Sequence, residues 1–304
     1  MMFRNEFKVV DIHGHLPYSL SFIKKHELFD EYNKERSKRM MLTWDFPIPE
    51  SEKETDENDN LPLMKRWEKE LDKYNIGTLN FLTAESNDVM ASQIKKNPAR
   101  FTGFAYHSIE SENAREELER AIDELGLKGY KLFGPLVNRE FHDPAFKELW
   151  KFIADRKLPV LIHFGMLGRA GGIVNHQNIS PLSLFQVARE YPEIPFIIPH
   201  FGAGYYQELL HLCWSCPNIY IDTSGSNQWV RWMPYHLDLE ILFRKTYELI
   251  GSERILFGTD SNGFPRGYAY RYLQEQVKVC REINMREDDI ENIFGNNARK
   301  LLNI

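Results

Sequence analysis

The chain of 304 residues is long enough for one large α/β domain or two ordinary domains, and its 42% hydrophobic and 13% aromatic content can fill a sizeable core. A net charge of −6, without any long basic run, argues against nucleic-acid binding. No apolar stretch reaches the length of a membrane span and residues 1–8 lack the apolar core of a secretory signal, so we expect a cytoplasmic protein.

The first predicted strand, residues 9–12, leads directly into His13-Gly14-His15. Residues two apart on a strand point to the same face, so both imidazoles can converge on one ion. Imidazole is the commonest neutral metal ligand in proteins. Seven further short apolar runs are strand candidates, and they cover residues 77–83, 100–106, 128–133, 159–163, 195–200, 218–223 and 254–259.

Helix-like segments separate these strands, with apolar residues at helical spacing as in Leu118, Ala121, Ile122 and Leu125. Eight short apolar strands alternating with helices predict an α/β fold, a (β/α)8 TIM barrel, as a single domain over residues 1–304. An open, doubly wound sheet is the structural alternative. It usually carries a glycine-rich phosphate-binding turn after its first strand, where this chain has His-Gly-His, and the barrel is therefore favoured.

Residues 16–62 interrupt the alternation of strands and helices. They contain no clear strand, and the polar stretch 51–60 follows Trp44, Phe46 and two prolines. Long connections within compact domains are usually lids or disordered segments. We expect a lid-like insertion after the first strand that folds over the barrel mouth, where Trp44 is a candidate substrate contact.

The three cysteines include Cys213 and Cys216, whose CxxC spacing is also typical of zinc and redox sites. There is no second CxxC, and the pair lies late in an apparent helix. Buried free thiols, which pack as small hydrophobes, are the preferred interpretation.

Potential metal ligands end four of the predicted strands. His13 and His15 end the first strand, His163 the fifth, His200 the sixth and Asp260 the eighth. In a TIM barrel the carboxyl ends of all strands meet at one mouth, where catalytic groups lie. Imidazoles with one carboxylate suit a divalent ion such as zinc and leave room for a water, whose pKa the ion lowers toward about 7. The sequence therefore predicts a metal-dependent enzyme.

The order of these motifs resembles the amidohydrolase superfamily, and within it the amidohydrolase-2 branch of TIM-barrel metal-dependent hydrolases. That branch also contains non-oxidative decarboxylases related to aminocarboxymuconate-semialdehyde decarboxylase. The resemblance covers essentially the whole chain. It rests on the segments Val-Asp-Ile-His-Gly-His (10–15), Leu-Ile-His-Phe-Gly (161–165), Pro-His-Phe-Gly-Ala-Gly (199–204), Asp-Thr-Ser-Gly (222–225), Phe-Gly-Thr-Asp (257–260) and Asn-Asn-Ala-Arg-Lys-Leu-Leu (296–302).

The resemblance implies that His13, His15, His163 and Asp260 hold one divalent ion, with zinc expected and manganese or another divalent ion as alternatives. His200 would then act beside it as the acid/base or carbonyl-polarising group, and Asp260 would also carry a proton.

Binuclear members of the superfamily place a carbamylated lysine at the end of strand four, and Lys131 lies near that position. The preferred interpretation is a lysine that pairs with a carboxylate or binds an anionic substrate. We therefore predict a single ion.

Substrate-binding residues are harder to identify from the sequence than the metal ligands. Arg169 follows the fifth strand in a glycine-rich loop, where a guanidinium can bind a carboxylate in bidentate fashion. His107 ends the third strand, with structural use and substrate contact equally open. The expected partner is a small-molecule substrate, and the aromatic loop 228–232 would suit either a homodimer interface or lid packing.

Three classes of function fit these features. The leading interpretation is a metal-dependent hydrolase that cleaves an amide, ester or lactone of a small organic acid. The alternative is a metal-dependent, non-oxidative decarboxylase of an aromatic or unsaturated carboxylic acid, which would use the same ligands. A non-catalytic binding protein on a barrel scaffold is disfavoured, because such proteins tend to lose ligands and all are present here.

Overall fold

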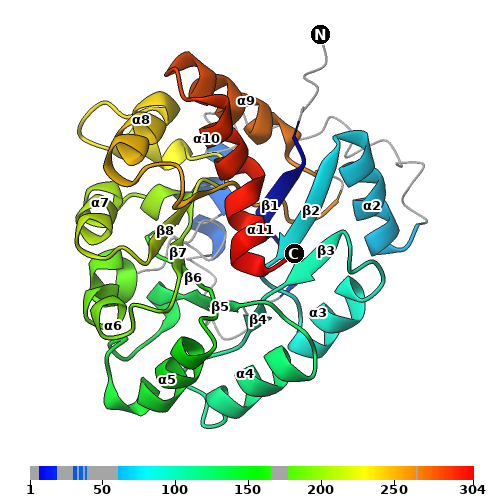
Figure 1. Ribbon diagram of the computed structural model, residues 1–304, viewed down its shortest axis with the longest axis vertical. Helices are drawn as coiled ribbons and strands as arrows, with labels where there is room; N and C mark the ends of the chain where they lie inside the picture. Colours follow the sequence, from blue (N-terminus) through cyan, green and yellow to red (C-terminus); the bar gives the residue numbers. More distant parts are fainter. Residues whose placement is uncertain are drawn as a thin grey trace.

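A computed structural model describes residues 7–18, 61–165, 177–264 and 266–304, together with 30–32, 34–36 and 38–39. Parallel strands form the wall of a (β/α)8 barrel with helices around it, which confirms the predicted fold class (Figure 1). The strands are β1 (Val9–Gly14), β2 (Ile76–Phe81), β3 (Phe101–Gly103), β4 (Ala105–Tyr106), β5 (Tyr130–Phe133), β6 (Val160–His163), β7 (Phe196–Ile198), β8 (Ile219–Asp222) and β9 (Ile255–Leu256).

The helices cover the outer face of this wall and follow the strands in turn. They are α2 (Leu63–Lys73), α3 (Asn87–Ile94), α4 (Ala114–Asp123), α5 (Lys147–Asp155), α6 (Phe185–Glu190), α7 (Tyr206–Ser215), α8 (Leu239–Ile250), α9 (Tyr270–Glu282), α10 (Glu287–Glu291) and α11 (Asn297–Leu302). Their apolar faces pack on the outward side chains of the strands in one large core.

Two irregular seams complete the barrel. The third predicted strand is divided at Phe104 into β3, which pairs with β2, and β4, which pairs with β5. The eighth predicted strand is regular only over β9, but its backbone continues beside β1. Along this second seam the N–H of Ile12 donates to the carbonyl of Phe257 (3.0 Å) and the N–H of Asp260 donates to that of His13 (2.8 Å). The metal-ligand candidates of β1 and Asp260 therefore lie across one seam.

The barrel interior is filled by apolar side chains from successive strands. Val10, Ile12, Leu161, Ile197 and Leu256 belong to one buried cluster, together with Ala298 and Leu302 of α11. These strand residues precede the strand ends that carry the histidines. The C-terminal helix α11 thus closes the end of the barrel opposite the candidate site, and Figure 1 shows it lying across the barrel centre.

Cys213 and Cys216 are free and buried, as predicted, and Cys280 is free and buried as well. Burial raises the pKa of the Cys213 thiol to about 12. The lid-like insertion 16–62 lies largely outside the described residues and stays a prediction. Among the residues that the structure describes, no helix combines the length and apolar character needed to cross a membrane.

Asp289 of α10 should make the fold sensitive to acid. Its buried carboxylate accepts hydrogen bonds from Tyr247 (2.6 Å), Ser252 (2.7 Å) and the Arg286 guanidinium (2.8 Å). The guanidinium and the hydroxyls hold its pKa below the usual range. The stability it contributes is therefore complete above the unfolded pKa of about 3.9 and is lost as the pH falls below it.

We expect Asp289→Asn to lower the free energy of unfolding by about 2–4 kcal/mol at pH 7. It should also flatten the pH dependence of that free energy below about pH 4. Urea titrations of both proteins at several pH values measure the two effects. If the free energy of unfolding of Asp289→Asn fell with acid as steeply as that of the original chain, this role of Asp289 would be contradicted.

Candidate metal centre

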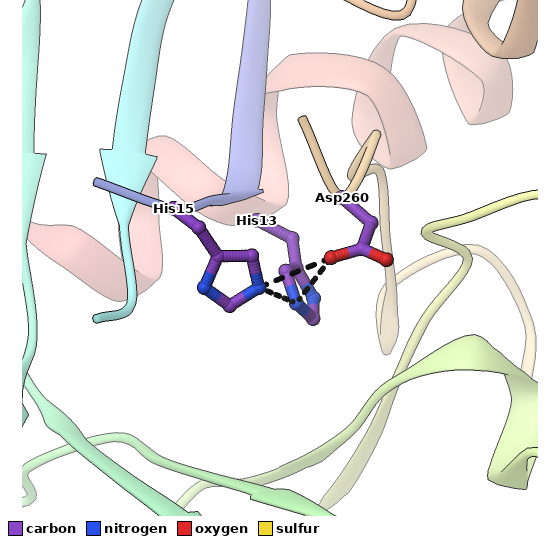
Figure 2. A group of neighbouring side chains, drawn as sticks. All are labelled: His13, His15 and Asp260. Atoms are coloured by element: carbon purple, nitrogen blue, oxygen red, sulfur yellow. Dashed lines mark hydrogen bonds and ion pairs between the residues drawn. The ribbon is translucent and has the colours of Figure 1, made fainter. Parts of the chain in front are cut away.

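Three potential ligands converge at the barrel mouth (Figure 2). His13 and His15 end β1, and Asp260 follows β9. Nε2 of His15 lies 3.2 Å from Nε2 of His13 and 3.0 Å from Oδ1 of Asp260, and the third distance, from His13 to Asp260, is 3.6 Å. Atoms bound to one ion at about 2.0–2.2 Å lie about 3–3.6 Å apart, so the three donor atoms are spaced to share one ion.

Hydrogen bonds at the other ring nitrogens turn these lone pairs inward. Nδ1 of His13 donates to Oδ2 of Asp222 (2.5 Å), which leaves the lone pair of the neutral ring on Nε2. Nδ1 of His15 lies 2.7 Å from the hydroxyl of Thr83. A cation between them can accept a lone pair from each of the two imidazole nitrogens and from the carboxylate oxygen. The residues present therefore fit a divalent metal ion.

The electrostatics of the site follow from burial. Burial lowers the pKa of His13 well below its ordinary value and raises that of Asp222 to about 6. Burial would also raise the pKa of Asp260, but the imidazoles that face it outweigh this effect and hold the pKa below the usual range. A neutral imidazole beside an ionised carboxylate is the state in which both bind a metal.

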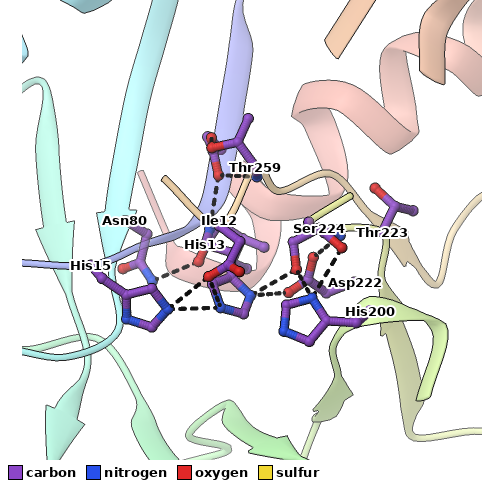
Figure 3. A network of polar contacts seen from close by, with 12 residues as sticks. Ile12, His13, His15, Asn80, His200, Asp222, Thr223, Ser224 and Thr259 are labelled. Carbon is purple, nitrogen blue, oxygen red and sulfur yellow. Dashed lines mark hydrogen bonds and ion pairs between the residues drawn. The ribbon is translucent and has the colours of Figure 1, made fainter. Parts of the chain in front are cut away.

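Ser224 connects the two sides of the mouth, as Figure 3 shows. Its hydroxyl lies 2.9 Å from Nδ1 of His13 and 3.0 Å from Nδ1 of His200. The same His200 nitrogen donates to the carbonyl oxygen of Ser224 (3.0 Å), which can only accept. When the His200 ring is neutral, its Nε2 therefore carries the lone pair and can accept a proton.

His163 does not join the three-residue group. Its ring centroid is 5.1 Å from that of His200 and 5.8 Å from that of Phe133, and the His200 ring is 5.0 Å from that of His13. The three rings thus form a row across the mouth. The role of His163 as a further ligand to the ion stays a prediction.

The backbone that carries His200 is strained. Residues 200–204 all have positive φ, from +44° at Ala203 to +102° at Gly204, and Asp260 also has a φ of +58°. Non-glycine residues in the left-handed region cost energy and concentrate at functional sites. The two glycines of the Phe-Gly-Ala-Gly segment permit this turn.

Lys131 on β5 is completely buried, and its Nζ has no hydrogen-bond partner in the part of the chain that the structure describes. The amine lies 4.4 Å from the centroid of the Phe133 ring, and burial lowers its pKa to about 7. The described residues include no ion pair to the lysine. Its expected carboxylate partner is not seen among them, and its proposed contact with substrate stays a prediction.

Of the other candidates, His107 has both ring nitrogens engaged, by the Ala114 carbonyl (3.0 Å) and by Asn87 (3.4 Å), and these bonds join it to α3 and α4. Its contact with substrate stays a prediction. Trp44 and Arg169 lie outside the described residues.

The sequence motifs alone indicate no role for Asp222 or Ser224. Asp222 ends β8, so the strand-end rule that located Asp260 could also have located it.

An alanine at Gly258 should disrupt this centre. A Cβ there would lie 2.7 Å from Cβ of His13, 2.8 Å from Oδ1 of Asp222 and 2.9 Å from Cβ of Ser224. We expect Gly258→Ala to weaken metal binding by at least about tenfold, because it displaces a ligand and the partner that orients it. Isothermal titration with Mn²⁺ measures the effect.

Gly126→Ala is the matched control for this substitution. Gly126 has a φ of +78° and open space around it, so alanine should lower stability by backbone strain alone. Equal metal affinities in the two variants would show that Gly258 does not shape the site.

Comparison with known proteins gives three informative similarities. The family model described as Amidohydrolase matches residues 10–304. Gamma-resorcylate decarboxylase of Rhizobium sp. (strain MTP-10005) is 22% identical over 267 residues, which cover 73% of this chain and 76% of that protein. An uncharacterized Tim-barrel protein from Bordetella bronchiseptica has a TM-score of 0.68 at 19% identity, covering 97% of this chain and 98% of that one.

A further solved structure contains ligands. It is 5-carboxyvanillate decarboxylase from Novosphingobium aromaticivorans, complexed with manganese and 4-hydroxy-3-methoxy-5-nitrobenzoic acid. Its TM-score is 0.63 at 15% identity, with 98% of this chain and 97% of that chain covered.

Proposed function

The chain belongs to the amidohydrolase family, and on that premise we propose that it is a metal-dependent carboxy-lyase, which removes CO2 from an aromatic carboxylic acid without oxidation. The convergence of His13, His15 and Asp260 at the barrel mouth is the observation that carries the proposal. The sequence alone favoured a hydrolase. The similarity to gamma-resorcylate decarboxylase over most of both chains supports the decarboxylase alternative instead.

The proposed centre holds one divalent ion on His13, His15 and Asp260, with His163 as a fourth ligand. The manganese in the Novosphingobium structure makes Mn²⁺ the first ion to test, ahead of the Zn²⁺ expected from the sequence. We keep the single-ion proposal, and metal analysis that returns close to two ions per chain would overturn it.

The proposed reaction uses the positive charge of the ion and a proton carried by Asp260. When bound, the ion supplies positive charge that orients the substrate oxygens and stabilises negative charge developing on the substrate. The bond from the ring to the carboxyl carbon breaks, CO2 leaves, and the ring carbon keeps the electron pair and takes up one proton. Asp260, whose side chain is 34% exposed, is the proposed carrier of that proton.

The position of Asp260 favours this role, because its partly exposed carboxyl group lies beside the metal-binding imidazoles at the mouth. His200, with its bare Nε2 beside the His13 ring, is the proposed second acid/base group, and Ser224 fixes its orientation.

Aromatic side chains beside the centre suit an aromatic substrate. Tyr18 stacks on the His15 ring at 5.4 Å and meets Tyr106 edge-on at 6.2 Å. Phe133 in turn packs between Tyr106 and His163, with centroid distances of 5.8 Å to each. Rings in these arrangements favour offset or edge contacts with a further aromatic ring. Arg169 and Trp44 as substrate contacts, and a homodimer, remain predictions.

An assay of CO2 release tests the proposal against hydrolysis. The metal-free protein is reloaded with Mn²⁺ or Zn²⁺ and supplied with gamma-resorcylate, with 5-carboxyvanillate, and separately with simple esters, amides and lactones of aromatic acids. We expect CO2 from at least one carboxylic acid, lost with a chelator and restored by the ion. Metal-dependent hydrolysis without any CO2 release would overturn the carboxy-lyase in favour of the hydrolase.

A further inference from the structure

Asp11 is a fully buried carboxylate on β1, two residues before the first histidine. Val10 and Ile12 on either side point into the barrel interior, so strand alternation places the Asp11 side chain on the opposite face. It accepts three hydrogen bonds. Oδ1 accepts from the backbone N–H of His13 (2.9 Å) and of Thr259 (3.1 Å), and Oδ2 accepts from the Thr259 hydroxyl (2.5 Å).

The first of these bonds changes the course of β1. In a regular strand His13 would share the face of Asp11 and point away from the barrel interior. The pairing of β1 with β2 is instead irregular between Asp11 and Gly14, and the His13 ring lies in the mouth beside Asp222 and His200. A side chain that accepts the backbone N–H two residues later replaces a hydrogen bond between strands. Such irregularities in a strand redirect side chains near active sites.

The other two bonds fix the segment that carries Asp260. Thr259 is the chain neighbour of Asp260, and its hydroxyl also lies 2.6 Å from that of Ser261. Both hydrogen-bond donors of Thr259, its backbone N–H and its hydroxyl, therefore donate to Asp11. The left-handed backbone of Asp260, at φ +58°, is thus anchored on the side facing β1.

We propose that Asp11 is a positioning residue for the metal centre. One carboxylate turns His13 into the mouth and holds the Asp260 segment across the barrel seam, so it sets the separation of two ligands from different strands. The inference rests on the proposed metal centre and concerns metal affinity, not the reaction that follows.

The test compares Mn²⁺ dissociation constants, measured by isothermal titration, with the melting temperatures of the metal-free proteins. We expect Asp11→Ala to raise the dissociation constant about 10- to 100-fold, the range typical of groups that orient metal ligands. Asp11→Asn keeps one oxygen for the two N–H groups and should fall between Asp11→Ala and the original chain. Thr259→Val, which removes only the hydroxyl bond, should raise the constant severalfold.

Ser252→Ala is the matched control, because it also removes a buried hydroxyl that donates to a buried carboxylate, that of Asp289. It should lower the melting temperature as Thr259→Val does and leave the dissociation constant unchanged. Constants within twofold of the original for both Asp11→Ala and Thr259→Val would overturn the inference. If Asp11→Ala does not fold, the inference is decided by comparing the Mn²⁺ dissociation constants of Thr259→Val and Ser252→Ala. Absence of metal binding by the unaltered chain would refute the proposed centre itself, and with it this inference.

Discussion

Replacing His13 by alanine should release the metal ion and lower kcat by at least about a thousandfold, or about 4 kcal/mol of transition-state stabilisation. Its Nε2 faces both His15 and Asp260, so the change removes the central donor of the three-residue group. It also leaves the buried Asp222 carboxylate without its imidazole partner. Metal content per chain and kcat for CO2 release measure the loss, and circular dichroism checks that the barrel is retained.

His211→Ala is the matched control for His13→Ala, since His211 is exposed on α7 and should affect neither metal content nor kcat. His163→Ala tests whether His163 is a fourth metal ligand. A loss of metal comparable to that of His13→Ala would place His163 in the ligand set, whereas full metal content would limit it to the row of rings beside His200. A His13→Ala protein that keeps one ion per chain and kcat within tenfold of the original would refute the proposed centre.

The sequence predicted the barrel because its signal is local and repeated. Apolar runs of strand length, each followed by a helical pattern, gave all eight strand positions to within a few residues. The strand-end rule also brought His13, His15 and Asp260 to one mouth although 245 positions separate the last two, because closure of a barrel makes sequence distance irrelevant.

Other features depend on contacts that no local pattern encodes. The bond from His13 to Asp222 joins residues 209 positions apart, and the row from His13 through His200 to His163 depends on the left-handed turn at 200–204. The irregular pairing of β1 runs against the strict alternation assumed for His13 and His15. The two imidazoles do converge, but with Asp11 accepting the His13 N–H rather than through an ideal strand.

Asp260→Asn should separate binding of the ion from transfer of the proton. Asparagine tolerates the left-handed backbone that Asp260 adopts, so the turn should survive the substitution. One side-chain oxygen remains to face His15, but the negative charge and the titratable proton are lost. We expect weaker metal binding, and at saturating Mn²⁺ a kcat about 10²- to 10⁴-fold below the original, the usual contribution of a general acid or base.

Titrating the variant with Mn²⁺ during the CO2 assay decides between the two roles of Asp260. If the carboxylate only held the ion, excess Mn²⁺ would restore kcat to within tenfold, and that outcome would contradict its role as proton carrier. A deficit that persists at full occupancy supports that role, because the amide can ligate through oxygen but cannot deliver a proton. Asp289→Asn is the matched control, since the same substitution far from the mouth should lower stability and leave kcat unchanged.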